Sequence, residues 1–329
     1  MRATLFCLGL MSLLASMQLE AQVTYDRILD SELEIGSWLT YSGNYASHRY
    51  SPLTHINRDN VSGLKVAWVY QARRRGPIEV SPIVVDDVMY ITEPPSTVTA
   101  LDTRTGRQLW TWSPTMPPGV LAIGFPRVNR GVAVLDDNVY VATLNAHLVA
   151  LDAKTGKQIW RVNRDGEKSN WSTPYIWENK LRTEIITPGT RKNRAYDLNG
   201  KLLYQFGGNS SITIATPFAK FGLLYVTSGY VGDRKKPMFA IRPGAKGDIS
   251  LESDKDKNEY VAWCQRRAGP YNPSTIIYGD LMYVLLDRGL IACYEAKTGK
   301  HVFGPERIVP RGGAFTSSPW AYNGRIFFL

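Results

Sequence analysis

The sequence predicts an all-β protein, a β-propeller of four-stranded antiparallel blades in an incomplete ring of about six to seven blades. Three observations predict this fold. A strand–turn–strand motif recurs along the chain, and its copies are spaced at nearly regular intervals. The runs between the copies read as strands of about five residues with almost no helical periodicity. The anchor positions of the motif are 102, 152, 197, 242 and 295, which lie 50, 45, 45 and 53 residues apart.

The clearest copy of the motif is the stretch from Val149 to Trp160. Val149 and Leu151 alternate as in a half-buried strand, Asp152 begins the turn, and the apolar run resumes before Trp160. Aspartate favours a turn because its carboxylate accepts hydrogen bonds from backbone N–H groups just ahead, and Gly156 accepts a positive φ at no steric cost. The motif therefore predicts a tight hairpin. Other copies span residues 100–110, 195–204 and 293–303, with a degraded copy at 240–244.

Each repeat begins with a Ser/Thr-Pro step, or a glycine in its place, that starts an inner strand. An Asp/Asn/Gly turn and a second strand follow, and then the hairpin. The sixth repeat stops at Phe327-Phe328-Leu329, before its hairpin. Two explanations stay open: the chain is a fragment, or a strand over residues 65–71 completes the sixth blade. The repeats start at Ser81, Gly131, Ser172, Ala215, Pro273 and Ser317.

The chain divides into three parts by composition. Residues 1–21 have a positive Arg2 and then a short apolar run, which predicts a secretory signal peptide and a periplasmic or secreted protein; the run is too short to cross a bilayer. Residues 22–64 form a polar, aromatic lead-in segment, with a short helical turn expected within 56–64. Residues 65–329 form the propeller domain, with its sixth repeat truncated.

Charge and cysteine content exclude several classes of function. The formal charge of +10 is scattered over turns, and no basic helix or nucleic-acid motif accompanies it, so we expect no nucleic-acid partner. After removal of the signal peptide only Cys264 and Cys293 remain. They read as buried small side chains, although export permits a disulfide. The four histidines are isolated in sequence, so we expect no histidine metal site.

The hairpin Ala-x-Asp-x-x-Thr-Gly-x-x-x-Trp resembles the repeat of the pyrroloquinoline-quinone (PQQ) β-propeller family. Residues 38–163 resemble the N-terminal part of quinoprotein (PQQ-dependent) alcohol dehydrogenases, and residues 164–329 resemble PQQ-like repeat propeller proteins. The dehydrogenase resemblance is carried by Arg49-Tyr50-Ser51-Pro52-Leu53, Ile56-Asn57-Arg58-Asp59-Asn60-Val61, Leu64-Lys65-Val66-Ala67-Trp68 and Val128-Asn129-Arg130-Gly131-Val132-Ala133.

The resemblance implies a bound PQQ cofactor and three contacts to it. Glu79, just before the first Ser/Thr-Pro step, and Arg130, in the Asn-Arg-Gly step, match residues that contact the quinone. Thr143 matches a threonine of the same site. An arginine fork and hydroxyl donors suit a tricarboxylate quinone, because its anionic oxygens accept charge-assisted hydrogen bonds. From the residues alone, Glu79 reads equally as a polar strand-end residue and Arg130 as a donor to blade carbonyls.

The chain departs from the dehydrogenase pattern at the metal and the base. The covering Cys-Cys pair falls on Gly124-Phe125, and the calcium-ligand positions fall on Thr187–Thr190 and Thr227–Tyr230, which carry no matching carboxylate or asparagine. The loop Ala268–Pro273 lacks the catalytic aspartate. Calcium needs several hard oxygen ligands, and alcohol oxidation needs a base, so we expect no metal site, and the catalytic residues are unknown.

Two functions follow from these features. One is an exported binding or scaffold propeller with a small-molecule or protein ligand at its axis. The alternative is a PQQ-dependent alcohol or sugar dehydrogenase, an oxidoreductase. The matching N-terminal half indicates that the chain is related to the dehydrogenases. The missing metal ligands and base favour the binding or scaffold function for this chain.

Overall fold

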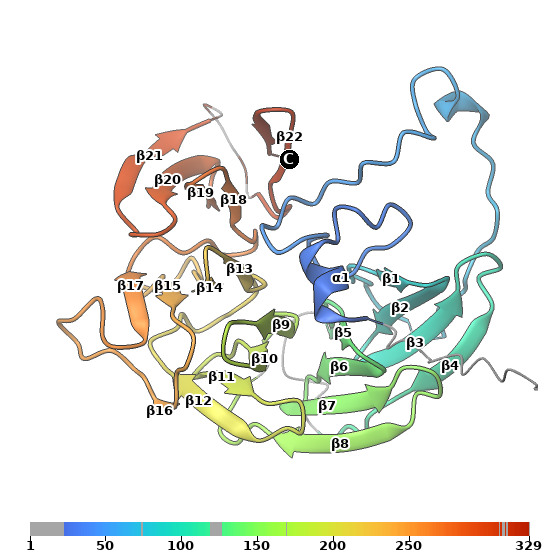
Figure 1. Ribbon diagram of the computed structural model, residues 1–329, viewed down its shortest axis with the longest axis horizontal. Helices are drawn as coiled ribbons and strands as arrows, with labels where there is room; N and C mark the ends of the chain where they lie inside the picture. Colours follow the sequence, from blue (N-terminus) through green and yellow to red (C-terminus); the bar gives the residue numbers. More distant parts are fainter. Residues whose placement is uncertain are drawn as a thin grey trace, which may run out of the picture.

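The structure is a computed structural model that describes residues 23–73, 75–118, 127–168, 170–308, 310, 313 and 315–328. The expected signal peptide and the Gly124-Phe125 position lie outside the described residues. Within them, the strands form six separate sheets, antiparallel except for one short parallel strand, arranged around a common axis, as Figure 1 shows. The predicted all-β propeller architecture is therefore confirmed.

The first three sheets follow the predicted order of strands, with the first strand of each repeat nearest the axis (Figure 1). Sheet 1 is β1 (Ile83–Val85), β2 (Val88–Glu93), β3 (Thr97–Asp102) and β4 (Gln108–Trp112). Sheet 2 is β5 (Ala133–Leu135), β6 (Asn138–Ala142), β7 (His147–Asp152) and β8 (Gln158–Asn163). Sheet 3 is β9 (Tyr175–Glu178), β10 (Thr183–Thr187), β11 (Asn193–Tyr196) and β12 (Leu202–Phe206).

The remaining sheets include one insertion and one two-stranded pair. Sheet 4 is β13 (Phe218–Lys220), β14 (Leu223–Thr227), β15 (Met238–Ile241) and β17 (Val261–Gln265). The intervening β16 (Gly247–Asp248) pairs in parallel with β12 of sheet 3. Sheet 5 is β18 (Ile276–Tyr278), β19 (Leu281–Leu286), β20 (Leu290–Glu295) and β21 (His301–Arg307). Sheet 6 is β22 (Trp320–Tyr322) and β23 (Arg325–Phe327).

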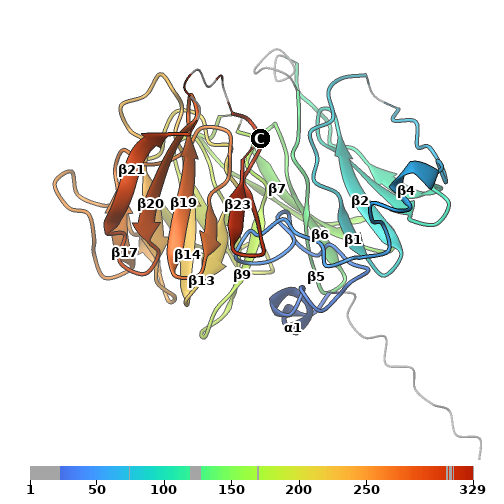
Figure 2. The same ribbon diagram turned by 90° about the horizontal axis from the view of Figure 1, so that it is seen from above.

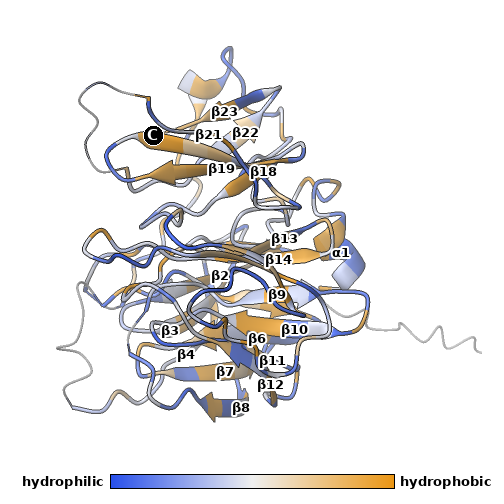
Figure 3. Cartoon of the chain, turned by 90° about the vertical axis from the view of Figure 1, so that its left-hand side faces the viewer, coloured by the Kyte–Doolittle hydropathy of each residue, from blue (hydrophilic) through white to orange (hydrophobic). Residues whose placement is uncertain are grey.

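The predicted turn chemistry forms the hairpins between the third and fourth strands. Asp152 Oδ1 accepts hydrogen bonds from the Thr155 amide at 2.7 Å and from its hydroxyl at 2.6 Å, and Gly156 has φ +70°. The Thr155 hydroxyl in turn holds the pKa of Asp152 below its usual value. Hydrophobic residues gather on the strands (Figure 3), because the sheets pack face to face around the axis and exclude water there.

A tryptophan in an outer strand joins each of several sheets to the next. Trp110 Nε1 donates to Ala153 O at 2.8 Å, one residue after the aspartate of the following hairpin. A Cβ on Gly156 would lie 2.5 Å from the Trp110 ring, so glycine is required by both space and φ. The same donor arrangement recurs for Trp160 with Leu198 O at 3.0 Å and for Trp263 with Ala296 O at 3.0 Å. The expected packing of tryptophan between blades is thus observed.

The first part of the lead-in segment, residues 23–48, lies near the axis (Figure 1). The whole segment contains α1 (Tyr25–Leu29), which lies at one end of the sheets in Figure 2, and η1 (Val61–Gly63), which matches the expected helical turn. Residues 23–48 bond the innermost strands of five sheets through the backbone, and Tyr45 packs on Tyr175 of sheet 3 at 5.4 Å between ring centroids. The bonded pairs are Val23–Asp136, Trp38–Val84, Tyr45–Ala219, Ala46–Ile277 and His48–Ala321.

The strand expected over residues 65–71 is absent, so that prediction is wrong. Among the described residues it has no neighbouring strand with which to exchange backbone hydrogen bonds, and Val66 and Val69 are about four-fifths exposed. Side chains hold it to sheet 1 instead. Trp68 Nε1 donates to Thr103 O at 2.8 Å, and the Tyr70 hydroxyl donates to the buried Glu93 at 2.8 Å.

Cys264 and Cys293 are buried free thiols and do not pair. Burial raises the pKa of Cys264 to about 11 and also raises the pKa of Cys293. Among the described residues, no helix has the length and apolar character needed to span a membrane.

Candidate functional site

Residues immediately before the innermost strands form a pocket on the axis. The cavity has a volume of about 490 Å³ and is lined from all six sheets. Five lining residues stand four positions before the first residue of an innermost strand, so the repeat itself brings them to one place. These are Glu79, Trp171, Ile214, Asn272 and Thr316. We call this cavity the axial pocket.

Two of the three predicted cofactor contacts meet in the axial pocket. Arg130 Nη2 donates to Glu79 Oε2 at 3.0 Å, although the two residues are 51 positions apart in sequence. The Arg130 side chain is 18% exposed, and that of Glu79 is 42% exposed. The Arg130 Nε is buried and has no hydrogen-bond partner among the described residues. The guanidinium is therefore only partly satisfied by the protein itself.

Thr143, the third predicted contact, lies elsewhere. It is buried in the turn between β6 and β7, where its hydroxyl donates to Asn145 Oδ1 at 2.6 Å and accepts from the His147 amide at 3.2 Å. It does not line the axial pocket. Its observed role is to hold the turn.

The sequence interpretation missed the aromatic wall of the pocket. Trp171 and Tyr271 both line it, and the Tyr271 ring meets that of Tyr230 edge-on at 5.2 Å. Burial raises the pKa of Tyr271, with smaller contributions from Tyr230 and Asp287, and Arg130 opposes the shift. The phenol therefore remains a hydrogen-bond donor at neutral pH. Counting back four residues from each inner strand would have located Trp171 and Asn272.

A second cavity of about 750 Å³ adjoins the axial pocket, because Tyr271 and Asn272 line both. Three basic residues line this vestibule: Lys236, Arg267 and Arg288. Burial raises the pKa of Asp287, which also lines it, although Lys236 Nζ lies 3.6 Å from its carboxylate and opposes the shift. An anion that entered through the vestibule would meet positive charge before it reached Arg130.

The residues that the structure describes offer few grouped acidic side chains for calcium. They contain no cluster of three or more histidine, cysteine, aspartate or glutamate side chains placed to hold a metal ion. Thr187 and Thr227, at the expected ligand positions, are buried, and neither lines the axial pocket. The donor set fits a flat anionic organic molecule better than a hard cation.

Comparison with known proteins places this fold in a family. The sequence model described as outer membrane protein assembly factor BamB, a PQQ-repeat model, matches residues 94–303. The chain belongs to the PQQ-repeat β-propeller family. A second PQQ model, described as the β-propeller domain of glucose/ethanol/alcohol dehydrogenase, matches residues 38–137 of this PQQ-repeat propeller.

Similar proteins include quinone-dependent alcohol dehydrogenases. This PQQ-repeat propeller is 46% identical over 101 residues to the 1-butanol dehydrogenase (cytochrome c) of Thauera butanivorans, covering 30% of this chain and 14% of the relative. It is 41% identical over 117 residues to quinohemoprotein alcohol dehydrogenase ADH-IIG of Pseudomonas putida, covering 35% of this chain and 16% of the relative. The match therefore spans a small part of each curated relative.

Solved structures share the fold over most of this chain. The ADH-IIG structure has a TM-score of 0.72 at 26% identity and covers 88% of this chain, which spans 51% of that enzyme. BamB from Moraxella catarrhalis has a TM-score of 0.56 at 13% identity, covers 80% of this chain and is itself covered over 72%. At that identity the BamB likeness concerns the fold alone.

Proposed function

We propose that this PQQ-repeat propeller is a binding protein whose ligand is a flat, carboxylated quinone of the PQQ class, held in the axial pocket. The observation that carries the proposal is the Arg130–Glu79 pair at 3.0 Å on the wall of a 490 Å³ cavity. A cavity of this size suits one small organic molecule.

The residues of the pocket fit such a ligand in three respects. The Arg130 guanidinium has a buried Nε without a partner, and a ligand carboxylate could accept from it in the forked geometry that arginine favours. Trp171 and Tyr271 provide aromatic surface for a flat ring system. The basic vestibule attracts anions. Bound PQQ would supply a two-electron redox centre.

The same residues support binding more than catalysis. Oxidation of an alcohol needs a base close to the hydroxyl proton. Among described residues the axial pocket has one carboxylate, Glu79, and it is paired with Arg130. Asp287 lines the vestibule and lies beside Lys236. We therefore infer that this chain holds its ligand without turning over an alcohol.

A PQQ-dependent alcohol or sugar dehydrogenase is the second candidate. It is supported by the dehydrogenase family match over residues 38–137 and by the 46% identity to a 1-butanol dehydrogenase. This candidate requires Ca²⁺, and the described residues include no cluster of three or more acidic, histidine or cysteine ligands for it.

One titration separates these candidates. PQQ is added to the purified protein, and tryptophan fluorescence and quinone absorbance are followed with and without Ca²⁺. We expect micromolar binding that does not depend on Ca²⁺ and that Arg130→Ala weakens by about tenfold or more, while the exposed Arg104→Ala leaves it unchanged. Circular dichroism checks that both variants fold.

An activity assay completes the test. Ethanol, 1-butanol or glucose is added with a dye acceptor, PQQ and Ca²⁺. We expect no dye reduction. Reduction that depends on PQQ would establish the dehydrogenase instead. Absence of PQQ binding would overturn both candidates and leave a protein-binding scaffold.

We also propose that the protein is exported through residues 1–21 and acts in the periplasm or outside the cell. Expression of the full chain in a bacterium and N-terminal sequencing of the mature protein test this. A mature N-terminus at Gln22 is expected, and an intact Met1 in the periplasmic fraction would contradict it.

A further inference from the structure

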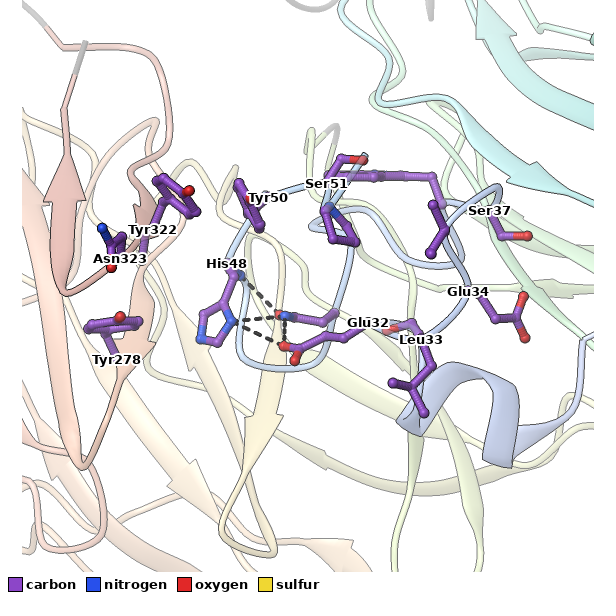
Figure 4. A pocket seen from close by; sticks show the side chains of 17 residues that line it. Glu32, Leu33, Glu34, Ser37, His48, Tyr50, Ser51, Tyr278, Tyr322 and Asn323 are labelled. Atoms are coloured by element: carbon purple, nitrogen blue, oxygen red, sulfur yellow. Dashed lines mark hydrogen bonds and ion pairs between the residues drawn. The ribbon is translucent and has the colours of Figure 1, made fainter. Parts of the chain in front are cut away.

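A third cavity lies at the other end of the innermost strands. It has a volume of about 400 Å³ and is enclosed by the lead-in segment and the far ends of β18 and β22 (Figure 4). Its lining includes Ser31, Glu32 and His48 from the lead-in segment, and Tyr278 and Tyr322 from sheets 5 and 6. We call it the lower pocket. It shares no lining residue with the axial pocket.

The charge of the lower pocket is opposite to that of the protein. The chain carries a formal charge of +10, yet none of the described residues that line this cavity is lysine or arginine. Two carboxylates line it. Glu34 is paired with Arg27, from which both of its oxygens accept at 2.6 and 2.8 Å, and the same guanidinium also bonds Asp86. Glu32 remains as the acidic group that faces the cavity.

Glu32, whose side chain is 64% exposed, is held in position by Asn44. Its Oε1 accepts from Asn44 Nδ2 at 2.5 Å and lies 3.3 Å from His48 Nδ1 (Figure 4). His48 Nε2 lies 3.1 Å from the carbonyl oxygen of Ile277, so this nitrogen carries the proton. His48 Nδ1 then accepts from Asn44 Nδ2 at 2.9 Å, so His48 positions the amide that donates to Glu32. The other Glu32 oxygen has no protein partner among the described residues.

Four aromatic rings line the same cavity as this carboxylate. Tyr50 and Tyr322 stack at 4.5 Å between centroids and are 39% and 46% exposed. Tyr278 meets the His48 ring at 5.8 Å. Trp38 lies against Gly43, where a Cβ would come within 3.0 Å of its ring. The faces of such rings attract cations, through the negative part of their quadrupole.

One buried polar atom in the lining lacks a partner. Ser31 is 9% exposed, and its hydroxyl makes no hydrogen bond to any described residue. A buried hydroxyl without a partner is costly, and a ligand with a hydroxyl or ether oxygen would satisfy it. This observation is independent of the charge and of the rings.

We propose that the lower pocket binds a small organic cation of the hydroxyalkyl-ammonium class, with the ammonium group against Glu32 and the tyrosine rings and its oxygen near Ser31. A fixed carboxylate and aromatic faces without a competing basic residue recognise this chemistry. The site is separate from the axial pocket and does not rest on the function proposed for it.

Calorimetric titration of the full chain with choline tests the proposal, with 3,3-dimethylbutan-1-ol as a neutral ligand of the same shape. We expect choline to bind at least about tenfold more tightly than the neutral alcohol. Glu32→Gln and Tyr322→Leu should each weaken choline binding several-fold, because the first removes the charge and the second removes the ring face. Tyr322→Phe keeps the ring and should bind normally.

The control variant is Asp254→Asn, which removes a carboxylate from an exposed loop remote from the cavity. It should bind choline as the wild type does. Equal affinity for choline and the neutral alcohol, or equal effects of Asp254→Asn and Glu32→Gln, would overturn the proposal. Co-sedimentation with phosphatidylcholine vesicles, without binding of free choline, would also overturn it in favour of a lipid surface.

Discussion

Trp68 lies against Gly106 so closely that a Cβ on residue 106 would come within 2.4 Å of the indole ring. Trp110 bears the same relation to Gly156, at 2.5 Å. In both pairs the indole N–H donates to the residue that follows the hairpin aspartate, at 2.8 Å. Trp68 therefore occupies the place of an outer-strand tryptophan, although it stands in an irregular segment before the first sheet.

The contact between tryptophan and glycine should contribute measurably to stability. Gly156→Ala introduces a methyl group against Trp110 at φ +70°, whereas Gly222→Ala introduces one at φ +72° with no atom within 4 Å. We expect a loss of about 1 kcal/mol for Gly222→Ala from the backbone alone, and of about 2–4 kcal/mol for Gly156→Ala. Urea unfolding measures both. Equal losses of unfolding free energy would show that the Trp110 ring moves aside without destabilising the protein.

Trp68 should anchor the segment that leads into sheet 1. Trp68→Ala removes the ring from Gly106 and the hydrogen bond to Thr103 O. We expect faster limited proteolysis within residues 65–73 and a loss of about 1–3 kcal/mol of unfolding free energy. Val66→Ala, at a residue 80% exposed, is the matched control and should change neither. Unaltered cleavage in Trp68→Ala would mean that Tyr70 and Glu93 hold the segment without it.

Acid should weaken the contacts that hold β16, the short strand that carries Asp248, against sheet 3. Burial alone would raise the pKa of Asp248, but Lys192 and Ser250 bond its carboxylate and hold the pKa at about 2. Since this lies below the ordinary value of 3.8, ionised Asp248 stabilises the folded chain above that value and loses this effect as the pH falls toward 2.

Asp248→Asn should therefore be less stable than the wild type at neutral pH, by up to about 1 kcal/mol because the pair is partly exposed, and equal to it near pH 2. Urea midpoints across this range provide the measurement. A difference that persists unchanged in acid would assign the effect to packing and not to charge.

The two buried thiols should be unreactive in the folded protein. The raised pKa values of Cys264 and Cys293 keep both groups protonated at pH 8, and the thiolate is the reactive form. We expect no reaction with an aromatic disulfide reagent in buffer and complete reaction in denaturant. Rapid labelling of native protein at either cysteine would contradict their observed burial.

The sequence determined the hairpins because their chemistry is local. Asp152, Thr155 and Gly156 bond within a single turn, so no distant contact decides their structure. The prediction of a strand over residues 65–71 was wrong for the opposite reason. Their aromatic and β-branched composition favours a strand, but a strand exists only with a neighbour, and no local pattern shows whether one is present.

The axial pocket was only partly predictable for the same reason. The resemblance to a family located Glu79 and Arg130, whose contact spans 51 positions. Thr143 does not line this pocket, and its hydroxyl bonds within its own turn, which the sequence does not reveal. Trp171 and Tyr271 passed unnoticed because aromatic residues are common in these repeats. The lower pocket combines residues from both ends of the chain, such as His48 and Tyr322, and no periodicity reveals such a pairing.

The lead-in segment has a consequence for how the protein folds. Trp38, Ala46 and His48 follow one another within a short stretch, and they bond sheets 1, 5 and 6, whose partners are spread from Val84 to Ala321. Residues 23–48 thus pair with segments more than 200 positions further along, such as Ile277 and Ala321, so contact order is high and closure of these long loops slows the final step. Each sheet can form locally during synthesis. Sheets 5 and 6, however, can dock only against the lead-in segment, which is synthesised earlier.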